Sequence, residues 1–301
     1  MDEFISCNIC PRNCNVNRYE KMGYCKSSPL PRVSKAYLHR WEEPCISGER
    51  GSGAVFFSGC CMGCTFCQNN EISHDNFGAD ITVDRLGEIY LELQEKGAHN
   101  INLVTPTHFV PVIRDSLKLA RRNGLIIPVI YNCGGYEKTE SLKTLEGLVD
   151  IYLPDIKYFS DKYSIKYSKA PGYFKYASAA VLEMVRQVGV PQFKDGMLVR
   201  GVMIRHMVLP GLLFDSKKIV DWVVRELPDD IYLNLMCQYT PMFGAEQYPE
   251  INRRVSPKCY DALVDYALNA GIKNGFIQEY ESASEKYVPL FNLEGVIRGN
   301  K

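Results

Sequence analysis

From about residue 53 onward, short runs rich in β-branched and aromatic residues alternate with longer stretches of helical hydrophobic periodicity. The expected strands cover residues 53–58, 100–105, 126–132, 150–157, 198–208 and 231–239, with a weaker candidate near residue 275. The expected helices cover residues 83–97, 110–124, 176–189, 215–227 and 256–271. Repeated strand–helix units with right-handed crossovers produce parallel strands, so the chain forms either an open doubly wound sheet or a barrel.

The residues after the first strand and the number of units decide between these two architectures. No G-x-G-x-x-G pattern follows the first strand, which weakens the dinucleotide-binding form of an open sheet. A closed barrel needs eight units, and six or seven are counted here. The sequence therefore predicts an α/β fold, a partial (β/α)6 TIM-type barrel of parallel strands, with functional residues at the C-terminal ends of those strands.

The first fifty residues lack this alternation and are cysteine-rich and loop-like. We expect a metal-binding N-terminal extension over residues 1–50 and the barrel over residues 51–301. The extension has little core of its own, so a bound metal is the expected source of its stability. Its cysteines form a complete ligand set for tetrahedral zinc or for an iron–sulfur cluster. These cysteines are Cys7, Cys10, Cys14 and Cys25.

Charge and hydropathy limit the expected binding partners and the cellular compartment of the protein. Lys and Arg together number 35, as do Asp and Glu, so no net charge attracts the chain to nucleic acid or to an anionic membrane. No apolar run approaches the roughly 20 residues that span a bilayer, and the acidic start MDEFISC has no signal-peptide core. We expect a cytoplasmic protein, in which the twelve cysteines serve as metal ligands or catalytic groups more often than as disulfides.

The segment SGCCMGCTFCQ, residues 58–68, directly follows the first expected strand and is called the cysteine loop below. Its spacing offers three converging thiolates in either of two sets. One set is Cys60, Cys64 and Cys67, and the other is Cys61, Cys64 and Cys67. Disulfides among them would be strained, and a closed zinc site normally takes four ligands in two separated pairs. A [4Fe-4S] cluster suits such a compact loop, and with three protein ligands one iron keeps an open coordination position.

At these residues the chain resembles the radical S-adenosylmethionine (SAM) superfamily, whose signature is C-x3-C-x2-C with an aromatic residue before the last cysteine. The resemblance implies that Cys60, Cys64 and Cys67 bind a [4Fe-4S] cluster, that Cys61 is a spare thiol, and that SAM chelates the fourth iron. It also implies an oxidoreductase that reductively cleaves SAM to methionine and a 5'-deoxyadenosyl radical. An external one-electron donor such as a flavodoxin or a ferredoxin would supply the electron.

Residues 39–73 and 100–113 look like the pyruvate formate-lyase activating enzyme-like branch of that superfamily. In such enzymes the radical abstracts hydrogen from a glycine Cα of a partner protein, the glycyl radical enzyme, and leaves a glycyl radical there. A second iron–sulfur cluster at the N-terminal cysteines would suit electron relay, and we prefer it there to zinc. The alternatives are a radical SAM enzyme acting on a small molecule, a peptide or RNA, and a non-catalytic zinc-binding protein.

The resemblance also implies SAM-binding residues at the strand ends. The family's G-G-E motif is replaced here by TPTH, residues 105–108, in which oxygens of Thr105 and Thr107 could accept the hydrogen bonds of the SAM amino group. The alternative is that TPTH is only a turn and helix cap. Asn132 precedes a pair of glycines that allow a ligand to approach the backbone closely.

Further residues complete the expected SAM site. Asp155 and Lys157 match an Asp-x-Lys pair of the activating enzymes, with a structural ion pair as the alternative. Arg205 matches the residue that reaches the SAM carboxylate or ribose, because a guanidinium binds a carboxylate through two hydrogen bonds. Gln238 is the candidate for adenine or substrate, and Phe66 either stacks on adenine or belongs to the core.

Overall fold

The computed structural model describes residues 2–278 and 289–298, and its centre is a set of six parallel strands. In sheet order these are β2 (Ser52–Phe57), β4 (Ile101–Val104), β5 (Val129–Cys133), β6 (Ile151–Pro154), β8 (Met197–Met207) and β9 (Tyr232–Met236). Each strand pairs in parallel with the next, and the spatial order follows the chain order. The predicted partial barrel of six strand–helix units is confirmed.

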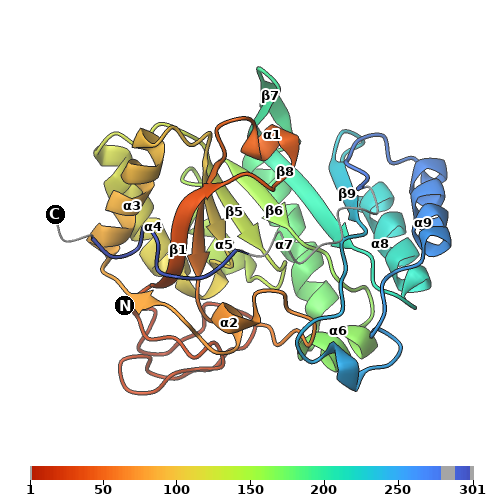
Figure 1. Ribbon diagram of the computed structural model, residues 1–301, viewed down its shortest axis with the longest axis horizontal. Helices are drawn as coiled ribbons and strands as arrows, with labels where there is room; N and C mark the ends of the chain where they lie inside the picture. The colour runs from red at the N-terminus through yellow and green to blue at the C-terminus, as the bar shows by residue number, and fades with distance from the viewer. Residues whose placement is uncertain (1, 279–288, 299–301) are drawn as a thin grey trace.

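The predicted helices lie outside this sheet. Figure 1 shows α3 and α4 at one end of the sheet and α8 and α9 at the other. Hydroxyl caps start two of the helices, because Thr82 accepts a hydrogen bond from the Arg85 amide and Ser256 accepts one from the Cys259 amide. The helices expected from the sequence are α3 (Val83–Glu95), α4 (Val110–Arg122), α7 (Tyr173–Val188), α8 (Leu213–Glu226) and α9 (Pro257–Ala270). Shorter helices are α1 (Pro44–Ser47), α2 (Asn70–Ser73), η1 (Thr107–Phe109), α5 (Thr139–Lys143), α6 (Asp161–Ser168) and η2 (Ala245–Gln247).

The N-terminal extension differs from the loop-like segment that its sequence indicates. Its residues 2–31 hold no helix or strand, but β1 (Arg32–His39) pairs antiparallel with β2 and extends the sheet. The expectation was wrong here because β1 carries buried polar residues, which hide its strand pattern. Their partners come from elsewhere in the fold: Ser34 donates to the Phe56 carbonyl oxygen, and the Lys35 ammonium donates to the Leu290 carbonyl oxygen. The division of the chain at residue 50 stays a prediction.

Three smaller strand segments complete the sheet. The two-residue β3 (Ala79–Asp80) pairs antiparallel with β1, and β7 (Gln192–Lys194) forms an antiparallel hairpin with the start of β8. The weak candidate near residue 275 lies parallel to β9, since the Leu233 and Leu235 amides donate to the carbonyl oxygens of Asn274 and Phe276. The last two residues of that candidate, 279 and 280, lie outside the described residues.

Helix α1 closes the end of the barrel interior at which the parallel strands begin. Asn100, directly before β4, donates a side-chain hydrogen bond to the Ile46 carbonyl oxygen. Cys45 and Ile46 pack among apolar side chains of the inner strand faces, such as Ile130, Ile151 and Met203. Figure 1 shows α1 beyond one end of the parallel strands, and the N-terminal loops with α2 and α6 beyond the other end. This second end is the C-terminal end of the strands, where the functional residues are expected.

Two glycines of the β7–β8 hairpin provide a matched test of this packing. Both have positive φ, but a Cβ on Gly196 would meet nothing within 4 Å, whereas one on Gly201 would lie 2.4 Å from the Val190 carbonyl oxygen. We expect Gly196→Ala to lower the free energy of unfolding by about 1 kcal/mol, and Gly201→Ala to lower it by about 3 kcal/mol or more. Urea titration of both variants measures this difference, and equal losses would contradict the described backbone contact.

Candidate active site

The cysteine loop begins at the end of β2 and is held by backbone contacts on two sides. On one side, Gly59 has a φ of +79°, and a Cβ there would lie 2.4 Å from the Cys25 carbonyl oxygen of the extension. On the other side, the amides of Gly63 and Thr65 donate to carbonyl oxygens at the end of α6, each at 2.8 Å. The loop therefore has a fixed backbone between the extension and α6.

A cavity of about 590 Å³ opens beside this loop. Its wall combines loop residues, the end of α2 and the segment before η2. The lining includes Cys60, Met62, Thr65, Ser73, His74, Phe243 and Gln247.

Each thiol proposed as a cluster ligand has a hydrogen-bonding neighbour. The Met62 amide donates to the sulfur of Cys60 at 3.3 Å, and the Ser168 hydroxyl donates to the sulfur of Cys64 at 3.0 Å. The sulfur of Cys67 lies 3.2 Å from the Ser73 hydroxyl. Donors of this kind stabilise thiolates, which are the form that binds iron.

Burial and charge act on these thiols in opposite directions. Burial raises the pKa of Cys64 to about 12 and also raises the pKa of Cys67. The Lys157 ammonium lies close enough to both thiols to act against that rise. For Cys60, a hydrogen bond from Cys61 lowers the pKa. A cationic group beside three thiols is the electrostatic environment that an anionic thiolate set requires.

These residues fit a cubane cluster better than a single metal ion. Within residues 2–278 and 289–298, no three His, Cys, Asp or Glu side chains are grouped so that they could hold one ion. In a [4Fe-4S] cluster each thiolate binds a different iron, so its ligands need not converge on one point. Three partly buried thiols on one loop meet that requirement.

Cys61 lies between the cysteine loop and the extension, and its role as a spare thiol stays a prediction. Its sulfur donates to the Tyr136 carbonyl oxygen at 3.7 Å, and it also hydrogen-bonds Cys60 and Cys10. The hydrogen bond from Cys61 lowers the pKa of Cys10 to about 7. Cys10 of the extension therefore lies against the cysteine loop, a proximity that residue spacing does not reveal.

The other three N-terminal cysteines differ in their neighbours, and Cys25 lies close enough to Cys10 for a charge there to raise its pKa. Cys7 packs in the main core with Phe4 and Ile9, whereas Cys10 belongs to the apolar cluster around Met62. The sulfur of Cys14 accepts a hydrogen bond from the Tyr24 amide at 3.4 Å, and burial raises the pKa of Cys25. The second metal site at these four residues, whether iron–sulfur or zinc, stays a prediction.

Asp155 and Lys157 meet the cysteine loop at the end of β6. Their side chains form an ion pair of 2.6 Å, and both are mostly buried. Burial opposes the charge of Lys157, but Asp155 and the nearby thiols raise its pKa. The structure thus brings this predicted pair together with the predicted cluster ligands.

The TPTH stretch forms a tight turn that leads into η1 and α4. Thr105 has a φ of +61°, and its amide donates to the carbonyl oxygen of Asn132, so the ends of β4 and β5 are joined. The Thr107 hydroxyl donates to a carboxylate oxygen of Glu137 at 2.5 Å. The Thr107 hydroxyl is thus engaged by Glu137, a residue that follows β5. The expected contacts of Thr105, Thr107 and Asn132 with SAM stay predictions.

Glu137 is a site residue that sequence reasoning missed. Its carboxyl group is buried and accepts hydrogen bonds from Thr107 and from the Tyr131 hydroxyl, the latter at 3.1 Å. Burial raises its pKa to about 8. The sequence signal was its place in YNCGGYE, directly after a strand end and two glycines.

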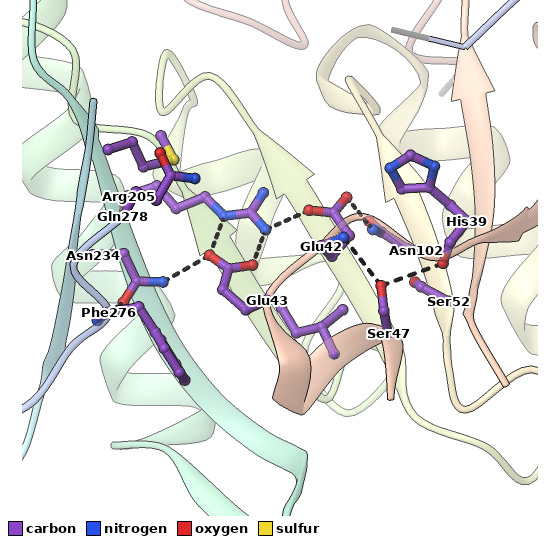
Figure 2. Close-up of polar contacts among 12 residues, drawn as sticks. His39, Glu42, Glu43, Ser47, Ser52, Asn102, Arg205, Asn234, Phe276 and Gln278 are labelled. Atoms are coloured by element: carbon purple, nitrogen blue, oxygen red, sulfur yellow. Dashed lines mark hydrogen bonds and ion pairs between the residues drawn. The ribbon is translucent and has the colours of Figure 1, made fainter. Parts of the chain in front are cut away.

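Arg205 lies inside the barrel but is engaged by two carboxylates, Glu42 and Glu43, that sequence reasoning also missed (Figure 2). Of the other predicted contacts, the Gln238 side chain accepts a hydrogen bond from Gln278 at 3.1 Å. Phe66 is buried, and its ring meets that of Tyr239 edge to face at 5.5 Å. The roles of Arg205, Gln238 and Phe66 toward SAM stay predictions.

Comparison with known proteins agrees with this geometry, because residues 54–223 match the model of the Radical SAM superfamily. This chain belongs to the radical SAM superfamily. Enzymes of this superfamily use a [4Fe-4S] cluster and SAM, and these are therefore its cofactors. The match includes the cysteine loop, most of β2 and the whole of β4, β5, β6 and β8.

Two archaeal relatives and one solved structure are similar to the chain. The uncharacterized protein MJ0674 of Methanocaldococcus jannaschii is 31% identical over 264 residues, which cover 84% of this chain and 71% of that protein. The uncharacterized protein MJ0808 of the same organism is 24% identical over 98% of this chain and 83% of its own length. Streptococcus suis SuiB, in a crystal structure bound to its precursor peptide SuiA, has a TM-score of 0.50 at 12% identity, over 73% of this chain. The chain spans about half of SuiB, 46% of its length, and this likeness concerns the fold alone.

In the part of the chain that the structure describes, no helix has the length and apolarity needed to cross a membrane.

The buried Glu137 carboxyl predicts a pH dependence of stability. Its pKa is about 8 in the folded chain, against an ordinary value of 4.5, so unfolding releases a proton between these two values. The stabilisation is therefore present below about pH 4.5 and is lost as the pH rises through 8. Relative to Glu137→Gln, which cannot ionise, we expect the free energy of unfolding of the natural chain to fall by about 1 kcal/mol per pH unit from pH 5 to 8.

Urea titrations at several pH values measure this difference. The exposed Glu95→Gln variant is the control and should follow the natural chain. Parallel curves for Glu137→Gln and the natural chain would contradict the raised pKa.

Proposed function

We propose that this chain holds a [4Fe-4S] cluster on Cys60, Cys64 and Cys67 and reductively cleaves SAM there, in order to abstract hydrogen from a substrate inside the open barrel. The observation that carries this proposal is the meeting of these three thiols with the buried Asp155–Lys157 pair at the strand ends. When bound, the cluster and SAM supply a 5'-deoxyadenosyl radical. The family match favours this enzyme over the alternative of a non-catalytic zinc-binding protein.

The chain's own residues prepare this site in three ways. The backbone contacts of Gly59, Gly63 and Thr65 fix the cysteine loop before any cofactor binds. The Lys157 ammonium offsets part of the negative charge that the thiolates bring. The cavity between the cysteine loop, the end of α2 and the segment before η2 leaves room for a ligand beside Cys60.

The proposed substrate is a glycine Cα of a partner protein, as in an activating enzyme for a glycyl radical enzyme. Support comes from the resemblance of residues 39–73 and 100–113 to that branch. A barrel of six parallel strands also leaves a lateral opening through which a peptide loop can enter. A flavodoxin or ferredoxin is the proposed electron donor, and the cytoplasm is the proposed compartment.

A second candidate function is radical modification of a small molecule or a peptide. The observation that favours it is the set of charged side chains inside the barrel, Glu42, Glu43 and Arg205. A glycine backbone carries no charge to match them. SuiB, whose fold is similar, was crystallised with its precursor peptide SuiA, which is a further reason to test a peptide here.

Cysteine variants test the reaction class. After anaerobic reconstitution, Cys60→Ala, Cys64→Ala and Cys67→Ala should each lose about four irons per chain and form no 5'-deoxyadenosine with SAM and dithionite. Cys61→Ala is the matched control on the same loop: the resemblance makes this thiol a spare, so the variant should keep both although it loses the hydrogen bond to Cys60. Iron and sulfide analysis and chromatography of the nucleoside provide the readouts. Full iron in any of the three variants would refute the ligand assignment.

A partner assay tests the substrate. The reduced holoenzyme with SAM should generate a glycyl radical, seen by electron paramagnetic resonance, on a glycyl radical enzyme from the same organism. The Cys64→Ala variant serves as the negative control. Deoxyadenosine formation without a radical on any such partner would sink the activating-enzyme proposal and favour the second candidate.

A further inference from the structure

A layer of polar side chains crosses the barrel interior, and we call Glu42, Glu43, Asn102, Arg205 and Asn234 the acidic layer. Figure 2 shows the Arg205 guanidinium between the two carboxylates. It donates to Glu42 at 2.6 Å, and to Glu43 through Nε at 3.0 Å and through Nη2. Asn234 donates to Glu43 at 2.7 Å, and Asn102 donates to Glu42 at 3.0 Å. Residues of β4, β8 and β9 thus meet the segment before α1.

The acidic layer contains one more carboxylate than cation. Two carboxylates share a single guanidinium, and the nearby Asp155 is already paired with Lys157. The Lys35 ammonium is engaged by Glu294 and by the Leu290 carbonyl oxygen. His39 lies beside Glu42, but its burial lowers its pKa and favours the neutral ring. A surplus negative charge in a largely buried site favours the arrival of a cation.

A second and independent feature is an acceptor without a donor. Asn102 is fully buried, and its Oδ1 has no hydrogen-bond partner although its Nδ2 donates to Glu42. The Asn102 side chain points toward Glu42, and its Nδ2 meets that carboxylate (Figure 2). Buried acceptors are almost always satisfied, so this oxygen indicates a missing donor.

The layer is open to a ligand and close to the proposed cluster site. The side chains are not fully buried: 10% of the Arg205 side chain, 14% of that of Glu42 and 12% of that of Glu43 remain exposed to solvent. The backbone of Arg205 bridges to Asp155, whose partner Lys157 faces the thiols of the cysteine loop. A group bound here would therefore lie inside the barrel, beside the place where the radical chemistry is proposed.

The chemistry of the layer selects an organic cation over a metal ion. The described residues provide no group of three His, Cys, Asp or Glu side chains for a metal, and Arg205 already occupies the space between the two carboxylates. An ammonium group has three N–H donors and no acceptor. Two of those donors match a Glu42 oxygen and the Oδ1 atom of Asn102.

We propose that the acidic layer binds the ammonium group of an amine-bearing substrate, contacting Glu42 and the unpartnered oxygen of Asn102. This inference rests on the second candidate function, radical modification of a small molecule or a peptide, and specifies the substrate class of that site. The shared chemistry is a primary ammonium, carried either by a small amine or by a lysine side chain of a peptide.

Ligand titration of the reconstituted holoenzyme with SAM, before any reductant is added, tests the proposal. Binding is followed by ligand-observed NMR with n-butylammonium, with the peptide acetyl-Gly-Lys-Gly-amide, and with 1-butanol as the neutral isostere. We expect saturable binding of at least one ammonium ligand and none of 1-butanol. Binding of only the amine or only the peptide identifies the source of the ammonium. Since no SAM is cleaved, the result does not depend on whether the proposed reaction occurs.

Variants locate the site. Glu42→Gln should weaken ammonium binding at least tenfold, while Glu95→Gln on α3 should bind as the natural chain does. Circular dichroism and a urea titration of Glu42→Gln guard against mere loss of fold. Equal binding of butanol and butylammonium, displacement of butylammonium by Mg²⁺ with equal affinity, or unchanged binding in Glu42→Gln would overturn the proposal.

Discussion

The buried contact of Arg205 with Glu42 and Glu43 ties the N-terminal extension to the barrel. Arg205 belongs to β8, whereas both carboxylates precede α1, the helix that closes the start of the barrel interior. Removing one partner of such a buried set leaves an uncompensated charge, which typically costs about 3–5 kcal/mol. The extension also contributes to the stability of the barrel through β1, which pairs with β2 along its length.

The cysteine loop depends on the same attachment. Its backbone approaches the extension at Gly59 and Cys25, and its spare thiol Cys61 meets Cys10. The other side of the loop is held by carbonyl oxygens of α6. Three thiols thus stand in fixed places on a loop that contacts two separate parts of the chain, which is the preorganisation that a cofactor site requires.

The sequence predicted the parallel strands, the long helices and the cysteine loop because these features are local patterns. Hydrophobic periodicity marks α3 and α4, and close cysteine spacing marks the loop. The strand β1 was missed because its buried Lys35 finds its partner 255 residues away, at Leu290. Glu42, Glu43 and Glu137 were missed for a similar reason: in the sequence they resemble surface residues, and only their distant partners make them part of the interior. Long-range pairing of polar groups leaves no periodic signal.

Glu43 and Glu137 show how this fold distributes charge around its interior. Both carboxyl groups are largely buried, and burial alone would raise the pKa of each. Attraction to Arg205 overcomes burial at Glu43 and lowers its pKa. The donors to Glu137, which include Thr107, Tyr131 and Cys133, are neutral, and its pKa rises to about 8. At neutral pH the strand ends of β4 and β5 therefore carry a largely neutral acid, and the negative charge is concentrated at the acidic layer. A barrel that keeps one carboxyl group neutral and another ionised has an electrostatic asymmetry, which would orient the proposed ammonium group toward Glu42.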